Sequence, residues 1–355
     1  FFFKQKTAYE IPKRDWSSDV CSSDLTTPFV AKQKELLLDS MLSNSQAKFN
    51  QVDVEYRCSF TKQKSDFDNT KPFIIIPSRN NLDLIEYTLN NLFINNIDEI
   101  CNIMVVDDRS TDNYSTLLKY SGLSLLRVDN EKGFNFSMLC NIGAYVAHKL
   151  GCSEIILWNN DLWVEKREYL ETIIKKHRED KSTISGTKLI YPLKSFNGNT
   201  EDSENVKQHF PNMKDGKWRG TVQFGGFAWI NTTNNALSLI PIHAKRFSDK
   251  TNSLVNTDKN DICVTGAFQI IDLKWFINKG GLNPSLSKNM QDIDVCLRAI
   301  EDNKKVCYYG KDIYFWHDES LTFYSQNEKK NDKQMMSDHV LFGKIWNSKL
   351  EKIIL

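Results

Sequence analysis

Apolar residues along the chain form short runs that alternate with stretches of helical spacing. The run at 72–77, PFIIIP, is apolar, β-branched and ended by proline, which is typical of a buried strand. The following segment, 82–94, is predicted to be a helix, because its apolar residues recur on one helical face. These residues are Leu82, Ile85, Leu89, Leu92 and Phe93.

The same alternation continues through the chain and predicts the fold class. Short apolar strands that alternate with amphipathic helices indicate an α/β protein with a mostly parallel sheet flanked by helices. Further strands are expected at 103–106, 123–128, 155–158, 306–309 and 313–316, and further helices at 136–150 and 292–300.

Polar residues gather where three of the predicted strands end. Residues 77–79 (PSR) close the first strand, 107–108 (DD) follow the second, and 159–161 (NND) follow a later one. The ligand of an open α/β sheet lies beyond the carboxyl ends of its strands. The sequence therefore predicts a binding site where these three clusters converge.

The remaining segments differ from this patterned region, which spans 71–325 and becomes irregular after residue 190. Residues 1–25 resemble a translated sequencing adapter and are left out of the predicted fold. Residues 26–70 are expected to be an N-terminal extension or linker, helical at 31–41 and linker-like from 61. Residues 326–355 are predicted to form a C-terminal, solvated helical segment.

Composition narrows the classes of partner. The chain has 355 residues, a net charge of +1 and 26% charged residues, which argues against a nucleic-acid-binding surface. Its eight cysteines show no zinc-binding spacing and lie mostly beside apolar stretches, so we expect reduced thiols and a cytoplasmic location. No apolar run reaches the roughly 18 to 20 residues that span a bilayer. We therefore expect at most peripheral contact with the inner face of the membrane.

Two residues are candidates for a metal site. Asp161 ends a strand after two amides, and Mg²⁺ and Mn²⁺ prefer oxygen ligands such as carboxylates. His317 follows the strand at 313–316, and a neutral imidazole is a competent ligand for Mn²⁺. Each has a structural alternative: Asp161 could cap a helix that begins near Glu165, and a single histidine is more often structural.

Three other carboxylates are candidates for binding and catalysis. Asp107 and Asp108 could accept hydrogen bonds from a nucleotide, or only shape the turn DDRSTD, which is also able to cap the following helix. Asp292, in QDIDVCLRAI, could deprotonate an acceptor hydroxyl as a general base. Its position at a helix start makes N-capping the alternative.

The order of these segments is more specific than any one of them. The chain reads strand–PSRN, strand–DDRSTD, strand–NEKGFNFSMLCNIGA, strand–WNND, TGAF, QDIDVCLR and a strand ending in WH. This succession resembles the family-two glycosyltransferases of the GT-A fold, particularly the bacterial enzymes that build surface polysaccharides. The resemblance covers 71–325 and implies a nucleotide-sugar half, 71–190, and a smaller acceptor half, 191–325.

The resemblance also implies a role for each candidate. Asp161 matches the last, metal-binding aspartate of the family's DxD motif, and His317 would complete the site for Mn²⁺ or Mg²⁺. Asp292 matches the aspartate of the family's ED motif, the expected catalytic base. FGKIW at 342–346 resembles a C-terminal segment of similar proteins. The residues that would bind the nucleotide sugar are Pro77, Ser78, Arg79, Asp107, Asp108, Asn141 and Asn160.

The implied function is transfer of a hexosyl or deoxyhexosyl group from a UDP-, dTDP- or GDP-sugar to a hydroxyl of a glycan or lipid-linked glycan. We expect an inverting, divalent-metal-dependent reaction in polysaccharide or glycoconjugate synthesis. The acceptor side is expected at 221–268, with Trp218 exposed beside it and Trp229 in the core.

Two departures from the family pattern leave other functions open. The DxD position reads NND, and the ED position reads Gln291-Asp292, so two acidic side chains are absent. One alternative is therefore a catalytically impaired nucleotide-sugar-binding protein. The other is a sugar nucleotidyltransferase, although PSRNN lacks the Gly-rich, basic loop that would grip a triphosphate.

Overall fold

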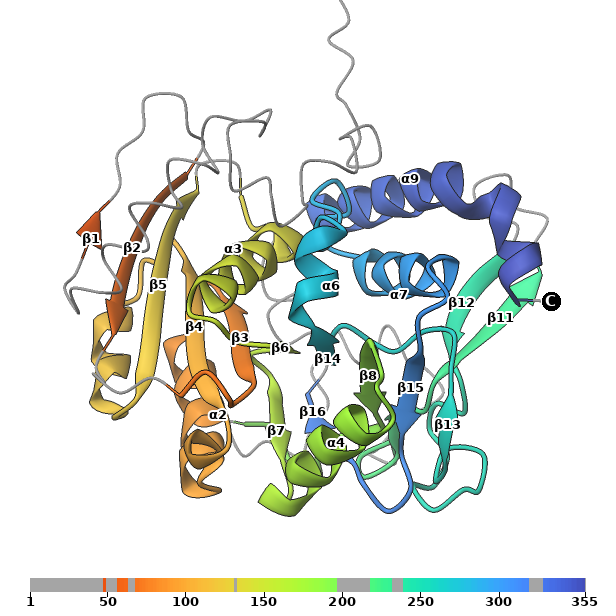
Figure 1. The fold of residues 1–355 in the computed structure, drawn as a ribbon, viewed down its shortest axis with the longest axis horizontal. Coiled ribbons are helices and arrows are strands. Elements are labelled where there is room, and N and C mark those ends of the chain that lie inside the picture. Colours follow the sequence, from red (N-terminus) through yellow and green to blue (C-terminus); the bar gives the residue numbers. More distant parts are fainter. Residues whose placement is uncertain are drawn as a thin grey trace, which may run out of the picture.

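The described residues of the chain form one large sheet and two small ones in a computed structural model (Figure 1). The structure describes residues 47–48, 56–62, 68–130, 133–196, 218–231, 239–318 and 328–354. The helix predicted at 31–41 and the adapter-like stretch 1–25 lie outside these ranges.

The large sheet has ten strands and is mixed: four of its nine neighbouring strand pairs are parallel and five are antiparallel. The predicted mostly parallel arrangement is therefore wrong for the sheet as a whole and holds for its four central strands. β3, β4 and β5 pair in parallel, and β6 joins β3 on the other side. β14 then runs antiparallel between β6 and β8. In sheet order the strands are β1 (Ala47–Lys48), β2 (Tyr56–Lys62), β5 (Leu123–Asn130), β4 (Asn102–Asp108), β3 (Phe73–Ser78), β6 (Glu154–Trp158), β14 (Phe268–Asp272), β8 (Ile184–Thr187), β15 (Val306–Tyr309) and β13 (Asp258–Asn260).

Two small sheets complete the strand pairing. One has the order β10 (Val222–Phe224), β9 (Leu189–Ile190), β16 (Phe315–His317) and β7 (Leu162–Val164). The other pairs β11 (Phe227–Asn231) with β12 (Leu239–His243). Because β16 pairs antiparallel with β7, His317 lies opposite Leu162, the residue after Asp161.

Helices cover the large sheet, and three of them, α2, α3 and α7, correspond to the helices that the apolar pattern predicts. α3 packs on β3 and β4, α4 on β8, and α7 on β15. In Figure 1, α6, α7 and α9 lie together on one side of the molecule. The helices are α2 (Leu82–Ile94), α3 (Phe136–Lys149), α4 (Arg167–Glu179), α6 (Leu273–Asn278), α7 (Gln291–Glu301) and α9 (Glu328–Ile354), with short 3₁₀ turns η3 (Ile97–Glu99) and η4 (Tyr114–Lys119).

The core is formed where the central strands meet these helices. Every residue of β3 and β6 is buried, which explains the apolar runs FIII and IILW within them. α3 approaches β3 closely at Gly143, where an added Cβ would lie 2.6 Å from Ile75 Cγ2. Glycine at this position therefore sets the distance between the helix and the sheet.

The structure differs from the sequence predictions in three places. β2 pairs antiparallel with β5 and extends to Lys62, so the stretch expected to be a linker from 61 begins within a strand. Trp218, expected to be exposed, is buried and packs edge-on against Tyr191. Asp112 does not cap the helix after its own turn; its Oδ2 accepts a hydrogen bond from Leu82 N at the start of α2.

The six cysteines within the described ranges that the apolar pattern placed in the core are buried and unpaired, as expected: Cys101, Cys140, Cys152, Cys263, Cys296 and Cys307. Trp229 is partly buried and packs against the core. Within the part of the chain that the structure describes, no helix has the length and apolarity needed to cross a membrane.

Candidate functional site

The first side of the site is built by two acidic residues at the end of β4. Asp107 accepts hydrogen bonds from Ser110 N at 2.9 Å and from Arg127 Nη1 at 2.8 Å. Burial raises the pKa of Asp107, and these donors partly offset the increase. Asp108, fully buried, forms an ion pair with Arg79 at 3.4 Å. Asp107 therefore shapes its own turn, as the structural alternative proposed, and both carboxylates are held in fixed positions.

A directed chain of hydrogen bonds joins the ends of β6 and β3. Asn160 Nδ2 donates to Ser78 Oγ at 3.1 Å, and Ser78 Oγ lies 2.8 Å from the hydroxyl of Tyr114. The Tyr114 hydroxyl donates to the carbonyl of Asn80 at 2.5 Å. Since this uses its only proton, Ser78 must donate to Tyr114 and accept from Asn160. Burial raises the pKa of Tyr114 to about 12, so it remains a donor at neutral pH.

The residues after β3 are tied to the turn after β4. Asn80 N donates to Ser110 Oγ at 2.8 Å, and Asn80 Oδ1 accepts from Thr111 N at 2.8 Å. Asn80 and Asn81 have φ angles of 55° and 59°, a left-handed conformation that asparagine tolerates better than most residues. Pro77 is buried within β3, opposite Val106. The turn after β3 and the turn after β4 are thus joined, and together they are called the rim.

Asp161 and His317 meet on the other side of this rim. Asp161 Oδ1 lies 3.1 Å from His317 Nε2, and both side chains are buried. Asn159 Nδ2 lies 3.3 Å from the same Nε2, and His317 Nδ1 lies 3.4 Å from Gln223 Oε1. Since Gln223 Oε1 can only accept, it favours the tautomer with the proton on Nδ1 and a lone pair on Nε2.

The Asp161–His317 pair fits a divalent cation. Two lone-pair atoms would then face each other at 3.1 Å, and buried Asp161 Oδ1 accepts no hydrogen bond from the residues that the structure describes. Adjacent ligands of an octahedral ion with bonds of about 2.1 Å lie about 3 Å apart. Among the described residues, no three or more His, Cys, Asp and Glu side chains are arranged so that they alone could hold a metal ion. A Mg²⁺-type site needs only one or two protein carboxylates when substrate phosphates supply the rest.

Asp292 lies in the first turn of α7, beside the TGAF segment. Its Oδ2 accepts a hydrogen bond from Gly266 N at 2.8 Å, and its Oδ1 accepts from Ile293 N at 2.9 Å. Met290, not Asp292, is the N-cap residue, so the capping alternative is wrong. Burial raises the pKa of Asp292, and the two backbone donors partly offset the increase. A carboxylate with a raised pKa is a stronger base than an ordinary aspartate.

The TGAF segment connects Asp292 with the NND segment. Asn159 N donates to Ala267 O at 3.0 Å, and the neighbouring Gly266 N donates to Asp292. An added Cβ at Gly266 would lie 2.9 Å from Asp292 Cβ, so only glycine allows this approach. The two segments, more than 130 residues apart in sequence, therefore lie on either side of one short turn.

Asn141 is placed differently from the other candidates. Its Nδ2 donates to Leu282 O and its Oδ1 accepts from Leu282 N, both at 2.8 Å. Gly281 has a φ of 69°, and an added Cβ there would lie 2.3 Å from Asn141 Oδ1. Asn141 thus fastens α3 to the loop before α7, and these two hydrogen bonds join it to neither the rim nor Asp161.

Residues 73–235 match the family model described as glycosyl transferase family 2. These residues form a family-two glycosyltransferase domain. The matched range contains the rim and Asp161, whereas Asp292 and His317 lie beyond it. This match confirms the predicted family, and the large sheet with its helices confirms the predicted α/β class. No curated protein matches the chain significantly.

Three solved structures are similar to the glycosyltransferase chain at low identity. GalNAc-T7 with UDP, GalNAc and Mn²⁺ is 11% identical, covers 71% of this chain and has a TM-score of 0.49. This chain spans 44% of that protein, less than half its length. S. aureus TarS in complex with UDP-GlcNAc is 15% identical over 75% of this chain and 70% of its own, with a TM-score of 0.44.

The third structure is the mannosyltransferase PcManGT from Pyrobaculum calidifontis in complex with GDP-Man and Mn²⁺. It is 12% identical to this glycosyltransferase chain and covers 77% of this chain and 63% of its own, with a TM-score of 0.44.

Sequence reasoning missed two residues of the glycosyltransferase site. Gln223 lies in the stretch TVQFGGFAWI, which differs in composition from the polar segments around it. Its neighbours in the sequence do not indicate that its side chain faces His317. Tyr114 follows the DDRSTD turn and is almost fully buried, although its hydroxyl joins the hydrogen-bond chain. The signal in the sequence is a tyrosine directly after a polar turn, because the hydroxyl of a tyrosine that packs into a core normally has a hydrogen-bond partner.

Proposed function

We propose that this glycosyltransferase moves a sugar from a nucleotide-diphosphate donor to a hydroxyl of a glycan acceptor, with inversion at the anomeric carbon. The observation that carries the proposal is the TGAF turn, which holds Asp292 on one side and the NND segment on the other. A base and a leaving-group site must lie on opposite sides of the transferred sugar in a single displacement.

The connected rim is the proposed nucleotide site. It presents Arg79, Asp108 and Asn160 at the carboxyl ends of parallel strands, where ligands of such sheets bind. Arg79 is partly exposed and carries the positive charge that a diphosphate or a base carbonyl would meet. The hydrogen bonds between the two turns keep these groups in place before a ligand arrives.

Asp161 and His317 are the proposed ligands of Mn²⁺ or Mg²⁺. When bound, the cation would neutralise the negative charge that develops on the diphosphate leaving group. Gln223 orients the His317 ring so that Nε2 lies beside Asp161, and the cation would take the place of the Asn159 Nδ2 donor at Nε2. Asn160 of NND donates to Ser78, which is a different role from that of a second acidic ligand.

Asp292 is the proposed general base. Its carboxylate would accept the proton of the acceptor hydroxyl while the acceptor oxygen bonds to the anomeric carbon and the bond to the diphosphate breaks. Each oxygen of Asp292 accepts one backbone hydrogen bond and retains a lone pair for this proton. Gly266 and Ile293 thus hold the carboxylate in place without occupying it fully.

The proposal is tested by incubating the purified chain with UDP-, GDP- and dTDP-sugars, Mn²⁺ or Mg²⁺, and a panel of glycan acceptors. A thermal-shift screen first identifies the donor, because a bound ligand stabilises the folded state. We expect turnover with one donor class and loss of turnover in Asp292→Asn. Donor binding without transfer or hydrolysis would support the impaired binding protein, and pyrophosphate release from a nucleoside triphosphate would support the nucleotidyltransferase.

A further inference from the structure

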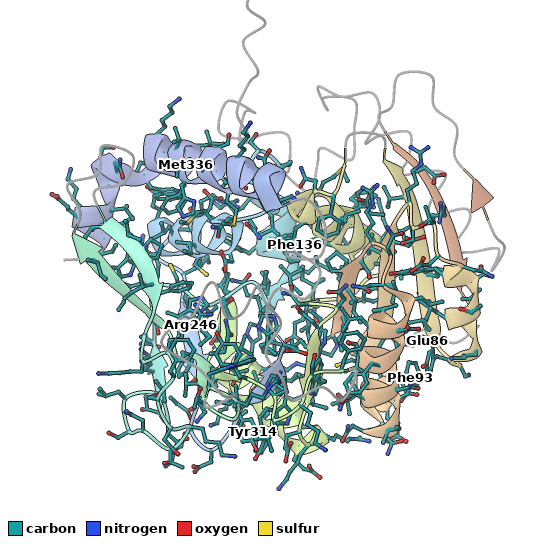
Figure 2. The ribbon with its side chains drawn as sticks, turned by 180° about the vertical axis from the view of Figure 1, so that it is seen from behind. Glu86, Phe93, Phe136, Arg246, Tyr314 and Met336 are labelled. Atoms are coloured by element: carbon teal, nitrogen blue, oxygen red, sulfur yellow. The ribbon has the colours of Figure 1, made fainter. Side chains whose placement is uncertain are left out.

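The C-terminal helix α9 is anchored against α7, the helix that carries Asp292 (Figure 1). Its residues Phe342, Trp346 and Leu350 are fully buried and lie at helical spacing, so this side of α9 belongs to the core. Figure 2 shows Met336 of α9 at the outer edge of the molecule, where its side chain is exposed. The predicted solvated helix is therefore half buried.

A buried carboxylate of α9 holds the loop that leads into α7. Asp338 Oδ2 accepts hydrogen bonds from Lys288 N at 2.9 Å and Asn289 N at 3.1 Å. Its Oδ1 accepts from Gln334 Nε2 at 2.8 Å, and the Asp338 side chain is almost fully buried. The two backbone donors come directly before Met290, the N-cap residue of α7, so Asp338 fixes the start of that helix.

A second contact joins α9 to α7 at Asp294, one turn after the N-cap residue Met290. Trp346 Nε1 donates to Asp294 Oδ1 at 2.9 Å, and Arg298 Nε donates to Asp294 Oδ2 at 3.0 Å. Arg298 in turn donates to the carbonyls of Lys279 and Gly281. The FGKIW segment thus has a defined partner, Asp294, which lies two residues after Asp292.

These contacts affect the position of the Asp292 carboxylate, because the structure on both sides of Asp292 leaves little room for it to shift. Met290 has a φ of 65°, so α7 begins with a sharp turn that the loop must maintain. On its other side, Asp292 is pressed against Gly266, where no Cβ would fit. A displacement of about 1 Å in a catalytic group can lower a rate about 100-fold.

We propose that Asp338 and Trp346 of α9 are positioning residues for the reaction, which hold α7 so that Asp292 faces the acceptor hydroxyl. The inference rests on the proposed role of Asp292 as general base. α9 is then a part of the catalytic framework as well as of the core, although neither residue touches the substrate.

The test compares steady-state kinetics of Asp338→Ala, Asp338→Asn and Trp346→Phe with the wild-type chain, using the donor found by the thermal-shift screen. We expect kcat to fall about 10- to 100-fold in Asp338→Ala and Trp346→Phe, with the KM for the donor within about threefold of wild type. Asp338→Asn keeps an acceptor oxygen for the two backbone donors and should retain most of the activity.

Ile173→Ala in α4 is the matched control, because it removes a fully buried side chain from a helix that covers β8, away from α7. It should lower the melting temperature and leave kcat at 25 °C within about twofold of wild type, since partial loss of stability does not change the folded site. Folded Asp338→Ala and Trp346→Phe with wild-type kcat would overturn the inference. Wild-type activity in Asp292→Asn would instead overturn the proposed base, so the two failures are distinguishable.

Discussion

The side-chain amide of Asn160 donates a hydrogen bond to Ser78 Oγ at 3.1 Å, and this bond joins the carboxyl ends of β6 and β3. The direction of this hydrogen bond is set by the next hydrogen bonds in the series, because the Tyr114 hydroxyl donates its only proton to Asn80 O. An aspartate at position 160 could only accept in its ionised form. The amide in the NND segment is therefore required by its neighbours.

Introducing an acidic residue at this position should weaken the rim. We expect Asn160→Asp to destabilise the protein by about 1 to 3 kcal/mol, because the Ser78 hydroxyl then faces two acceptors with one proton. Chemical denaturation measures the change in the free energy of unfolding. A double-mutant cycle with Ser78→Ala isolates the interaction between Asn160 and Ser78. A coupling energy near zero would show that the hydrogen bonds do not run in the inferred direction.

Gln223 should control cation binding through His317. Replacing Gln223 by Met removes the acceptor for His317 Nδ1, and we expect about 10- to 100-fold weaker Mn²⁺ binding, as for other residues that orient metal ligands. Gln223→Glu keeps an acceptor oxygen and should bind Mn²⁺ nearly as well as wild type. Calorimetric titration with Mn²⁺ and a nucleoside diphosphate measures both, and equal affinities for all three proteins would contradict the prediction.

Asp161 should be essential for the same cation. We expect Asp161→Ala to abolish measurable Mn²⁺ binding and to reduce turnover to the level seen for wild type after chelator treatment. The physical reason is that Asp161 supplies a buried carboxylate oxygen 3.1 Å from His317 Nε2. An unchanged dependence of rate on Mn²⁺ concentration in Asp161→Ala would remove this residue from the site.

Asp292 should set the acidic limb of the pH–rate profile. The pKa of Asp292 is raised above its ordinary value of 3.8 by burial, and the base is active only when ionised. Turnover should therefore decline at a higher pH than an unperturbed aspartate would produce. Asp292→Asn should lower kcat about 10²- to 10⁴-fold and lose this limb. Retention of the limb in the variant would assign it to another group.

Asn141 is expected to act on stability more than on donor binding. Removing its two hydrogen bonds to Leu282 in Asn141→Ala should cost about 1 to 3 kcal/mol in the free energy of unfolding. The affinity for the donor, measured by calorimetry on the folded variant, should change by less than about threefold, since that free energy is lost from a loop outside the rim. A large loss of donor affinity with unchanged stability would return Asn141 to the nucleotide site.

The sequence by itself determined the elements and the edge of the sheet where the site lies. The apolar run at 72–77 and the helical spacing at 82–94 correspond to β3 and α2, because burial on a strand or on one helix face imposes a local period. Asp107, Asp108 and the NND segment lie at one rim because they end strands that pair in parallel.

Only the tertiary structure decided which of these residues meet. His317 reaches Asp161 because β16 pairs with β7, a contact between segments about 150 residues apart that no local pattern encodes. The same holds for Gln223 beside His317 and for Asp338 on the loop before α7. A hydrogen bond depends on the direction and position of two side chains in space, and the period of hydrophobic residues along the chain contains neither.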